Sequence, residues 1–269
     1  MNPSALNVTI DFLKELLTPL IVAGAAYLFG LTTEKLRSRW RTRKIRALLM
    51  LKGRGLEIIL PTRQGRVASQ KGKTSPRTHY VTLNEVEIVL QLRWLLSTQG
   101  KHQIPIALAT DREKTSPDND LFYIGGMFAN ASVLPILTQN FSGFKVACSE
   151  ESYRAYADLR AILTPVAPNS DERWLESDHA RVLTFDRRHH SYIVLCRLSS
   201  EQHFGERHRG TTHILFGSDT VATLAAVMCY TEHLDELYAR IGTGRDSYLV
   251  AMLCDKKGEV DFKSLKRIG

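Results

Sequence analysis

Hydrophobic and polar positions divide the chain into an uncharged first stretch and a later part in which short apolar runs alternate with amphipathic ones. Residues 16–33 read LLTPLIVAGAAYLFGLTT and contain no charged side chain. As a helix with a rise of about 1.5 Å per residue, this stretch would cover roughly 27 Å, close to the hydrocarbon thickness of a bilayer. The pattern predicts a single N-terminal transmembrane helix.

The residues that follow this stretch are strongly cationic, since EKLRSRWRTRKIR at 34–46 holds seven Lys and Arg. Positive charge on one flank of a membrane helix stays on the cytoplasmic side. We therefore expect a single-pass protein of the inner membrane, with membrane lipid as a partner and the C-terminal part in the cytoplasm. A buried core helix with a basic, solvated continuation is the alternative interpretation.

The rest of the chain alternates between runs of strand length and segments of helical period. Expected strands are 55–63, 104–110, 120–126, 143–149, 212–217 and 247–254, the last followed by a terminal hairpin. Expected helices are 82–100, 130–140, 150–163 and one long helix after 220, and the runs 180–186 and 190–198 should form a hairpin. Such alternation predicts an α/β fold, a Rossmann-like three-layer domain with a mostly parallel sheet and an antiparallel hairpin. The predicted domains are 1–54 and 55–269.

The formal net charge of the whole chain is +8, and residues 1–54 supply +7 of it with ten Lys and Arg against three acids. The remainder is nearly neutral, whereas a general nucleic-acid binder carries positive charge on its folded domain. We therefore expect no direct binding of duplex nucleic acid. The cysteines form no CxxC pair and should be buried, reduced thiols; they are Cys148, Cys196, Cys229 and Cys254.

Ligands of open α/β sheets bind at the carboxyl ends of the strands, and four such ends can be named here. They are Pro61–Arg63 with the basic loop after it, Thr110–Asp111, Gly125–Gly126 leading to Asn130, and Gly217–Thr220. The last two have the strand–turn–helix form in which backbone N–H groups meet an anion. The predicted ligand-binding residues are Gly125, Gly126, Asn130, Gly217, Ser218, Asp219, Thr220, Arg63, Lys71 and Lys73.

Ordinary structural roles remain open for these residues. Asn130, Ser218 and Asp219 could be helix caps, and the loop lysines could belong to a solvated turn. Catalytic residues stay unassigned, because the carboxylates that a glycosidase would need are candidates by position only. These carboxylates are Glu85, Glu87, Asp111 and Asp219. No motif for a cofactor or metal is present, so neither is expected.

A helix, a basic stretch and a Rossmann-like body together resemble the membrane-anchored effectors of prokaryotic nucleotide signalling that carry a CARF- or SLOG-type sensor domain in antiviral defence. At residue level the resemblance depends on YIGGMFAN and ILFGSDT. It implies that a nucleotide-type ligand, such as a cyclic oligonucleotide, binds across paired sensor domains and that the helices then act on the membrane.

Three functions are therefore open at this point. The first, which is preferred over an enzyme, is a sensor and effector that binds a nucleotide-type ligand. The second is a membrane-tethered nucleotide or NAD glycosidase or hydrolase, and the third is a non-catalytic interaction protein. A homo-oligomer is expected, because small residues on the first helix would let a second copy approach closely; they are Ala23, Gly24, Ala25, Ala26 and Gly30.

Overall fold

The computed structural model of the protein describes residues 3–61, 63–65, 78–80, 83–100, 104–108, 116, 118–125, 133–141, 145–146, 172–177, 180–186, 188–199, 209–242 and 247–268. The chain forms two compact units, Met1–Lys44 and Ile45–Gly269. The second is called the globular unit. The boundary between the units lies within the first helix, so the last turn of that helix belongs to the globular unit.

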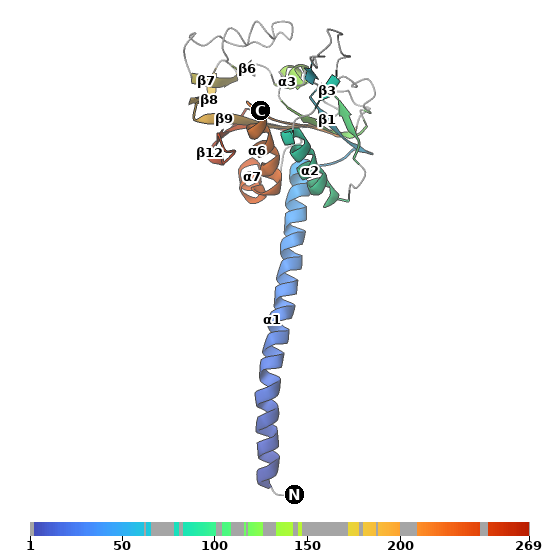
Figure 1. The fold of residues 1–269 in the computed structure, drawn as a ribbon, viewed down its shortest axis with the longest axis vertical. Helices are drawn as coiled ribbons and strands as arrows, with labels where there is room; N and C mark the ends of the chain where they lie inside the picture. Colours follow the sequence, from blue (N-terminus) through green and yellow to red (C-terminus); the bar gives the residue numbers. More distant parts are fainter. Residues whose placement is uncertain are drawn as a thin grey trace, which may run out of the picture. The chain divides into compact units, whose positions relative to one another are not determined.

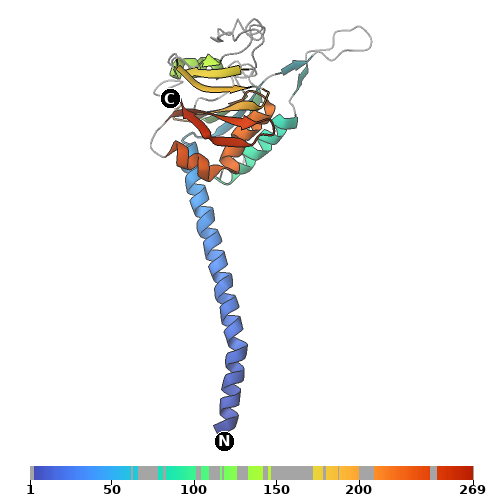
Figure 2. The same cartoon turned by 90° about the vertical axis from the view of Figure 1, so that its left-hand side faces the viewer.

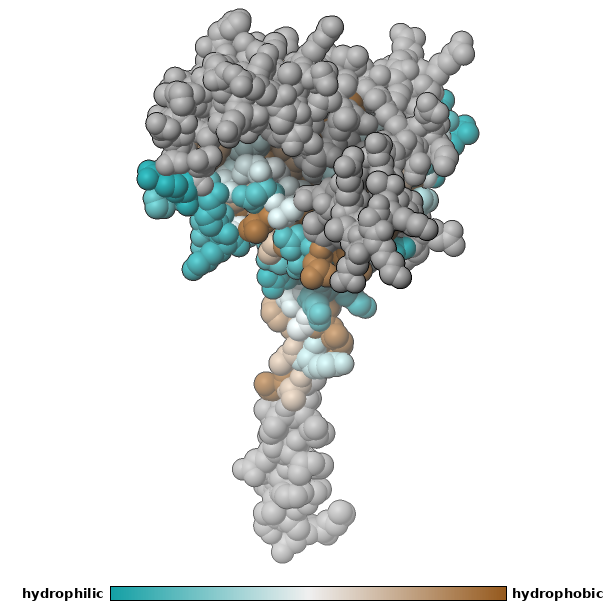
Figure 3. Space-filling view, turned by 45° about the horizontal axis from the view of Figure 1, so that its top comes forward, coloured by the Kyte–Doolittle hydropathy of each residue, from teal (hydrophilic) through white to brown (hydrophobic). Residues whose placement is uncertain are grey.

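The first helix, α1, runs over 47 residues from Pro3 to Leu49. Its side chains are described from Val22 onward, except at positions 24 and 25. Figure 3 shows brown apolar side chains among paler and teal ones on this part of the helix. The large apolar side chains exposed there are Val22, Tyr27, Leu28, Phe29, Leu31, Leu36 and Trp40. These side chains between Val22 and Trp40 are therefore not part of a buried core. Ile45, Leu48 and Leu49, by contrast, are buried in the globular unit.

Among the described residues, no helix combines the length and the apolar character that crossing a bilayer requires. The prediction of an N-terminal transmembrane helix is therefore wrong, and so is the single-pass inner-membrane localisation deduced from it. The membrane-lipid partner stays a prediction.

A seven-stranded sheet with the order β12-β11-β9-β10-β5-β1-β4 forms the centre of the globular unit. Its strands are β1 (Leu56–Leu60), β4 (Ile106–Leu108), β5 (Asp120–Ile124), β9 (His190–Ser199), β10 (Thr211–Gly217), β11 (Tyr248–Asp255) and β12 (Val260–Arg267). The pairings among β4, β1, β5 and β10 are parallel, and those among β10, β9, β11 and β12 are antiparallel. The sheet is thus mixed, with β4 and β12 at its edges.

Both faces of this sheet are covered, which explains why its central strands are apolar almost throughout. Figure 1 shows the helices α2 (Leu83–Ser97), α6 (Thr220–Thr231) and α7 (Leu234–Ile241) on one side. On the other side lie α3 (Val133–Asn140) and a small sheet. The strands of that small sheet are β6 (Lys145–Val146), β7 (Glu172–Ser177) and β8 (Ala180–Asp186). Alternate residues of β9 face the two layers, Ile193 and Leu195 toward the helices and Val194 and Cys196 away from them. The α/β class with three layers is confirmed.

Three details of the predicted fold are wrong. The sheet is half antiparallel in its pairings, not mostly parallel. The runs 180–186 and 190–198 are strands, but β8 pairs with β7 while β9 pairs with β10 and β11, so they form no hairpin with each other. The long helix after residue 220 is two helices, because the chain turns at Glu232–His233.

The cysteines that the structure describes are buried and free of disulfides, as predicted, and they are Cys196, Cys229 and Cys254. Burial raises the pKa of each thiol above its ordinary value, to about 12 at Cys254. Cys148 and the expected helix at 150–163 lie outside the described residues. The predicted terminal hairpin is confirmed as β11–β12, whose turn contains Gly258 at a φ of 93°.

The C-terminus of α1 is closed by side chains of the sheet. The buried Arg197 guanidinium donates hydrogen bonds to the backbone carbonyls of Ala47, at 2.9 Å, and Leu48. Met50 has a φ of 45°, the left-handed conformation that often ends helices, and its carbonyl accepts a bond from the Thr211 hydroxyl at 2.8 Å. These contacts satisfy carbonyls that have no partner within the helix.

Buried polar residues continue around this junction. Asp120 Oδ1 accepts backbone N–H bonds from Lys52, Gly53 and Thr211 at 2.8–3.0 Å. His213 is fully buried and stacks on Phe122 with ring centroids 4.3 Å apart. Asp120 and Thr211 are the first residues of β5 and β10, so the last turn of α1, which belongs to the globular unit, is held at the amino edge of the parallel strands.

Candidate functional site

The chain adds strands to the sheet on both sides of β1, with β4 on one side and β5 on the other. Leaving β1, the chain passes through α2 on one face to β4, and after β5 it passes through α3 on the other face. β1 therefore lies between β4 and β5, at the switch point where open α/β sheets bind ligands. Because β1, β5 and β10 are parallel neighbours, their carboxyl ends meet at one edge. This is called the carboxyl edge.

Gly125 ends β5 at this edge. Its φ is 88°, a backbone conformation that residues with a Cβ rarely adopt. Its N–H donates to the Leu215 carbonyl of β10 at 3.1 Å, which places the turn beside the end of β10. The turn after β5 therefore lies beside the end of β10 near Gly217, while Gly126 and Asn130 lie outside the described residues.

Gly217 has a packing role. A Cβ added at Gly217 would lie 2.3 Å from Ala222 Cβ and 2.7 Å from the Thr223 backbone nitrogen. The first turn of α6 thus packs directly on the end of β10. The Thr223 hydroxyl adds to this contact, since it accepts the Gly217 N–H at 3.0 Å and donates to the Asp219 carbonyl at 2.8 Å.

Asp219 is the N-cap of α6, which is the ordinary structural role left open for it. Its Oδ1 accepts the Ala222 N–H at 2.8 Å, with extended backbone at the cap. A carboxylate at this position occupies the positive end of the helix. The N-terminus of α6 is therefore already satisfied by the chain and is a poor place for a phosphate.

A polar network that the sequence did not predict surrounds Asp219. The buried Ser191 hydroxyl donates to Asp219 Oδ2 at 2.6 Å, and Lys256 Nζ donates to Ser191 Oγ at 2.9 Å. Lys256 Nζ lies 3.8 Å from Asp219 Oδ2, and these side chains are 45% and 41% exposed. The turn after β10, the start of β9 and the turn after β11 thus bring the Lys256 ammonium group and the Asp219 carboxylate together at the carboxyl edge. The only sequence signal was the position of Ser191 and Lys256 at strand ends.

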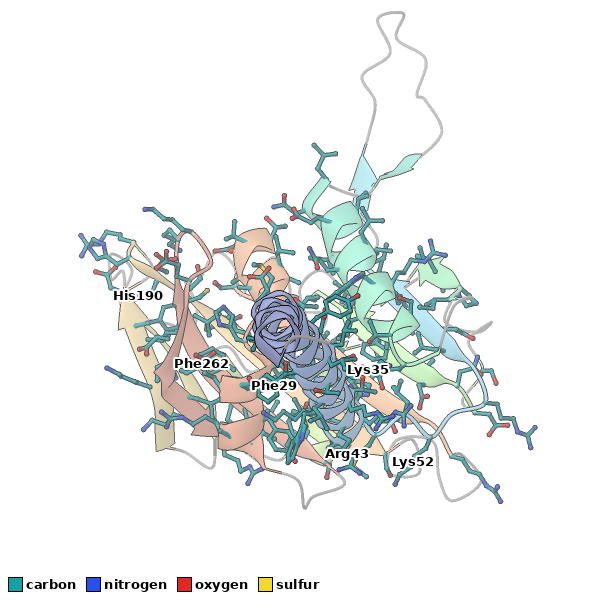
Figure 4. All side chains as sticks on the ribbon, turned by 90° about the horizontal axis from the view of Figure 1, so that it is seen from below. Phe29, Lys35, Arg43, Lys52, His190 and Phe262 are labelled. Atoms are coloured by element: carbon teal, nitrogen blue, oxygen red, sulfur yellow. The ribbon has the colours of Figure 1, made fainter. Side chains whose placement is uncertain are left out.

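The neighbouring residues of this turn have different surroundings. Ser218 is exposed, and its N–H donates to the Tyr192 carbonyl at 3.0 Å, which joins the turn to β9. Thr220 is half-buried as the first residue of α6. His190 is exposed at the start of β9, at the rim of the sheet in Figure 4.

The basic segment after β1 begins with Arg63. It is the first residue of β2 (Arg63–Gly65), which pairs with β3 (Thr78–Tyr80). This ribbon extends away from the main sheet in Figure 2. The ribbon leaves from the carboxyl end of β1, so its base belongs to the carboxyl edge, while Lys71 and Lys73 lie outside the described residues.

The other catalytic candidates do not gather at one point. Glu85 is buried in the first turn of α2, and Glu87 is exposed on the same helix. Asp111 lies outside the described residues. His213 is buried at the opposite, amino edge. Among the catalytic candidates that the structure describes, only Asp219 is a partly exposed carboxylate at the carboxyl edge.

Comparison with known proteins finds no matching family model, no matching curated protein and no matching solved structure. The resemblance to CARF- and SLOG-type effectors therefore remains a prediction. The function is inferred below from the geometry of the carboxyl edge.

Proposed function

We propose that the globular unit binds a small phosphate-bearing ligand of the nucleotide type at the carboxyl edge, and acts as a sensor. The observation that carries the proposal is the switch point at β1, beside which the turns of β5 and β10 lie. Crevices at such points are the usual ligand sites of open α/β sheets.

The charges at the edge suggest how the ligand is oriented. Asp219 repels phosphate and accepts hydroxyl groups, so the ribose hydroxyls lie toward Asp219. The phosphate lies toward the turn at Gly125, where the backbone can come close, and toward the base of the ribbon at Arg63. Lys256 is held beside Asp219 by Ser191 and supplies a partly exposed positive charge on the β11 side of Asp219, away from Gly125.

β10 offers a route by which binding could be sensed elsewhere. Its carboxyl end forms the proposed site, and at its amino end Thr211 bonds to the Met50 carbonyl at the end of α1. A ligand that binds one arrangement of β10 better than another shifts the population toward that arrangement. In this proposal the protein acts through α1 and through association of copies, without catalysis.

The test uses the full-length chain and a panel of inorganic phosphate, ATP, NAD and cyclic dinucleotides, measured by thermal shift and calorimetry. We expect one nucleotide to raise Tm, and Arg63→Ala and Lys256→Ala each to weaken its binding at least tenfold. Lys266→Ala is the matched control, because Lys266 pairs with Ala251 in mid-strand, away from the carboxyl edge. Absence of binding to every member, or equal binding by all variants, would overturn the proposal; release of a product would favour the hydrolase instead.

A further inference from the structure

Helix α2 is apolar on two sides. The side that faces the sheet carries the buried residues Ile88, Val89, Leu92, Leu95 and Leu96. The opposite side carries large exposed apolar residues, which are Leu83 at 87%, Val86 at 43%, Leu90 at 61% and Trp94 at 50% exposure. A helix that is apolar nearly all round is normally buried on all sides. One side of α2 is therefore built for contact with something outside the globular unit.

These four exposed residues form a continuous band, here named the α2 stripe. Residues three, four and seven positions apart share one face of a helix, which places Leu83, Val86 and Leu90 together. Val86, Leu90 and Trp94 are spaced by four and form a single ridge of the type that packs in the commonest class of helix pair. Figures 2 and 4 show α2 on the outside of the globular unit, where such a ridge is accessible.

We propose that the α2 stripe is the interface with a second copy of this chain, with the two α2 helices antiparallel about a twofold axis at Leu90. In a twofold interface the same patch meets itself. Leu90 then lies against Leu90 of the second copy, and the large Trp94 lies opposite the smaller Val86. Antiparallel helices also place opposite ends of their dipoles side by side.

The size of the stripe suits a dimer. Its four exposed side chains present on the order of 500 Å² of apolar surface, the size of the largest patch on a typical monomer, which is often a functional surface. Two copies would bury on the order of 1,000 Å², the lower bound for a specific interface. The area therefore fits a dimer that forms reversibly, and the masking of each stripe by the other removes an aggregation hazard.

Charge favours this surface over the exposed apolar part of α1. Around the α2 stripe the exposed charges Glu87 and Arg93 have opposite signs. By contrast, Leu36 and Trp40 of α1 are surrounded by Lys35, Arg37 and other cations, so that pairing there would gather like charges. The inference concerns association only and holds whether or not the proposed ligand binds.

The first experiment measures the mass of the full-length protein by sedimentation over a range of concentrations. We expect a dimer, and we expect Leu90→Glu to raise its dissociation constant at least tenfold with an unchanged circular dichroism spectrum, because Leu90 is exposed. Leu36→Glu on α1 is the matched control and should leave the dimer intact. A monomeric wild type, an unaffected Leu90→Glu variant, or loss of the dimer in Leu36→Glu would overturn the proposal.

The second experiment tests the antiparallel geometry by mild oxidation of single-cysteine additions, with the wild type as background. Leu90→Cys lies on the twofold axis and should form a disulfide-linked dimer. Leu83→Cys should not, because the two copies of this residue would lie at opposite ends of the helix pair. Cross-linking at both positions would indicate parallel helices, and cross-linking at neither would show that another element covers the stripe; each result would overturn the proposed dimer.

Discussion

The guanidinium of Arg197 donates a 2.9 Å hydrogen bond to the backbone carbonyl of Ala47, 150 residues earlier in the chain. Arg197 also lies over the ring of Tyr248, with its central carbon 4.8 Å from the ring centroid. A single buried cation thus closes the end of a helix and joins it to the middle of the sheet. The consequences for stability can be measured.

Replacing Arg197 with Met should leave the carbonyls of Ala47 and Leu48 without their charged donor in a buried site. We expect the free energy of unfolding to fall by about 2–4 kcal/mol, since unpaired buried acceptors lose their solvation. Urea unfolding of the full-length chain measures this change. Arg209→Met is the control, because Arg209 is exposed and should cost less than about 0.5 kcal/mol. Equal effects of the two changes would contradict the capping role.

Stability should also depend on pH through His213. Burial lowers the pKa of His213 to about 3, and the positive charge of Arg197 acts in the same direction, while the Leu49 carbonyl acts against both. The unfolded chain takes up this proton near pH 6.5. The contribution of His213 to stability is therefore complete above pH 6.5 and is lost as the pH falls toward 3, by up to about 5 kcal/mol.

Urea unfolding between pH 4 and pH 7 measures this dependence. His213→Phe keeps an aromatic ring beside Phe122 and cannot be protonated. In this variant the slope of the free energy of unfolding against pH should be smaller and should correspond to about one fewer proton taken up on unfolding. An unchanged slope would show that other groups cause the acid sensitivity.

Gly217→Ala should disturb the contact between β10 and α6. The new Cβ would lie 2.3 Å from Ala222 Cβ, and overpacking of this kind costs about 1–3 kcal/mol. Thermal unfolding measures the loss. Gly30→Ala is the comparison, because nothing lies within 4 Å of the added Cβ and alanine favours a helix over glycine. If Gly217→Ala were as stable as the wild type, the close approach would be without energetic significance.

Two substitutions separate the capping role of Asp219 from its charge. Asp219→Ala should cost about 1–2 kcal/mol, because the Ala222 N–H loses its acceptor. Asp219→Asn keeps an acceptor and should cost less than half as much, while it removes the negative charge beside Lys256. Chemical denaturation of both variants provides the measurement. Equal losses for Asn and Ala would mean that the ion pair stabilises this turn more than the cap does.

Local patterns predicted the elements that local interactions decide. The apolar runs of β1, β5 and β10 are strands, and α3 begins at Val133, so that Pro135 lies in its first turn, where proline is tolerated. Asp219 caps α6, which is one of the two roles that the sequence left open for it. The position of Gly125 beside the end of β10 depends on the pairing of β5 with β10, which the sequence did not predict.

Pairings across long sequence separations could not be predicted in this way. The turn before His190 is a local feature, but β9 does not pair with β8. It pairs with β10 and β11, which give it better-buried neighbours. Ser191 and Lys256 are 65 residues apart and meet only because β11 lies beside β9. The sequence shows apolar residues on two sides of α2, but it does not show which side packs on the sheet. Only the structure identifies the exposed side.

The two edges of the large sheet differ from its interior in a way that affects the behaviour of the protein at high concentration. In the described part of the chain β4 is three residues long, and β12 exposes Asp261, Lys263, Lys266 and Arg267 along its length. Short or charged edge strands resist the addition of a strand from another molecule. Crowded copies of this chain are thereby hindered from polymerising into cross-β fibrils, and concentrated solutions should remain free of them.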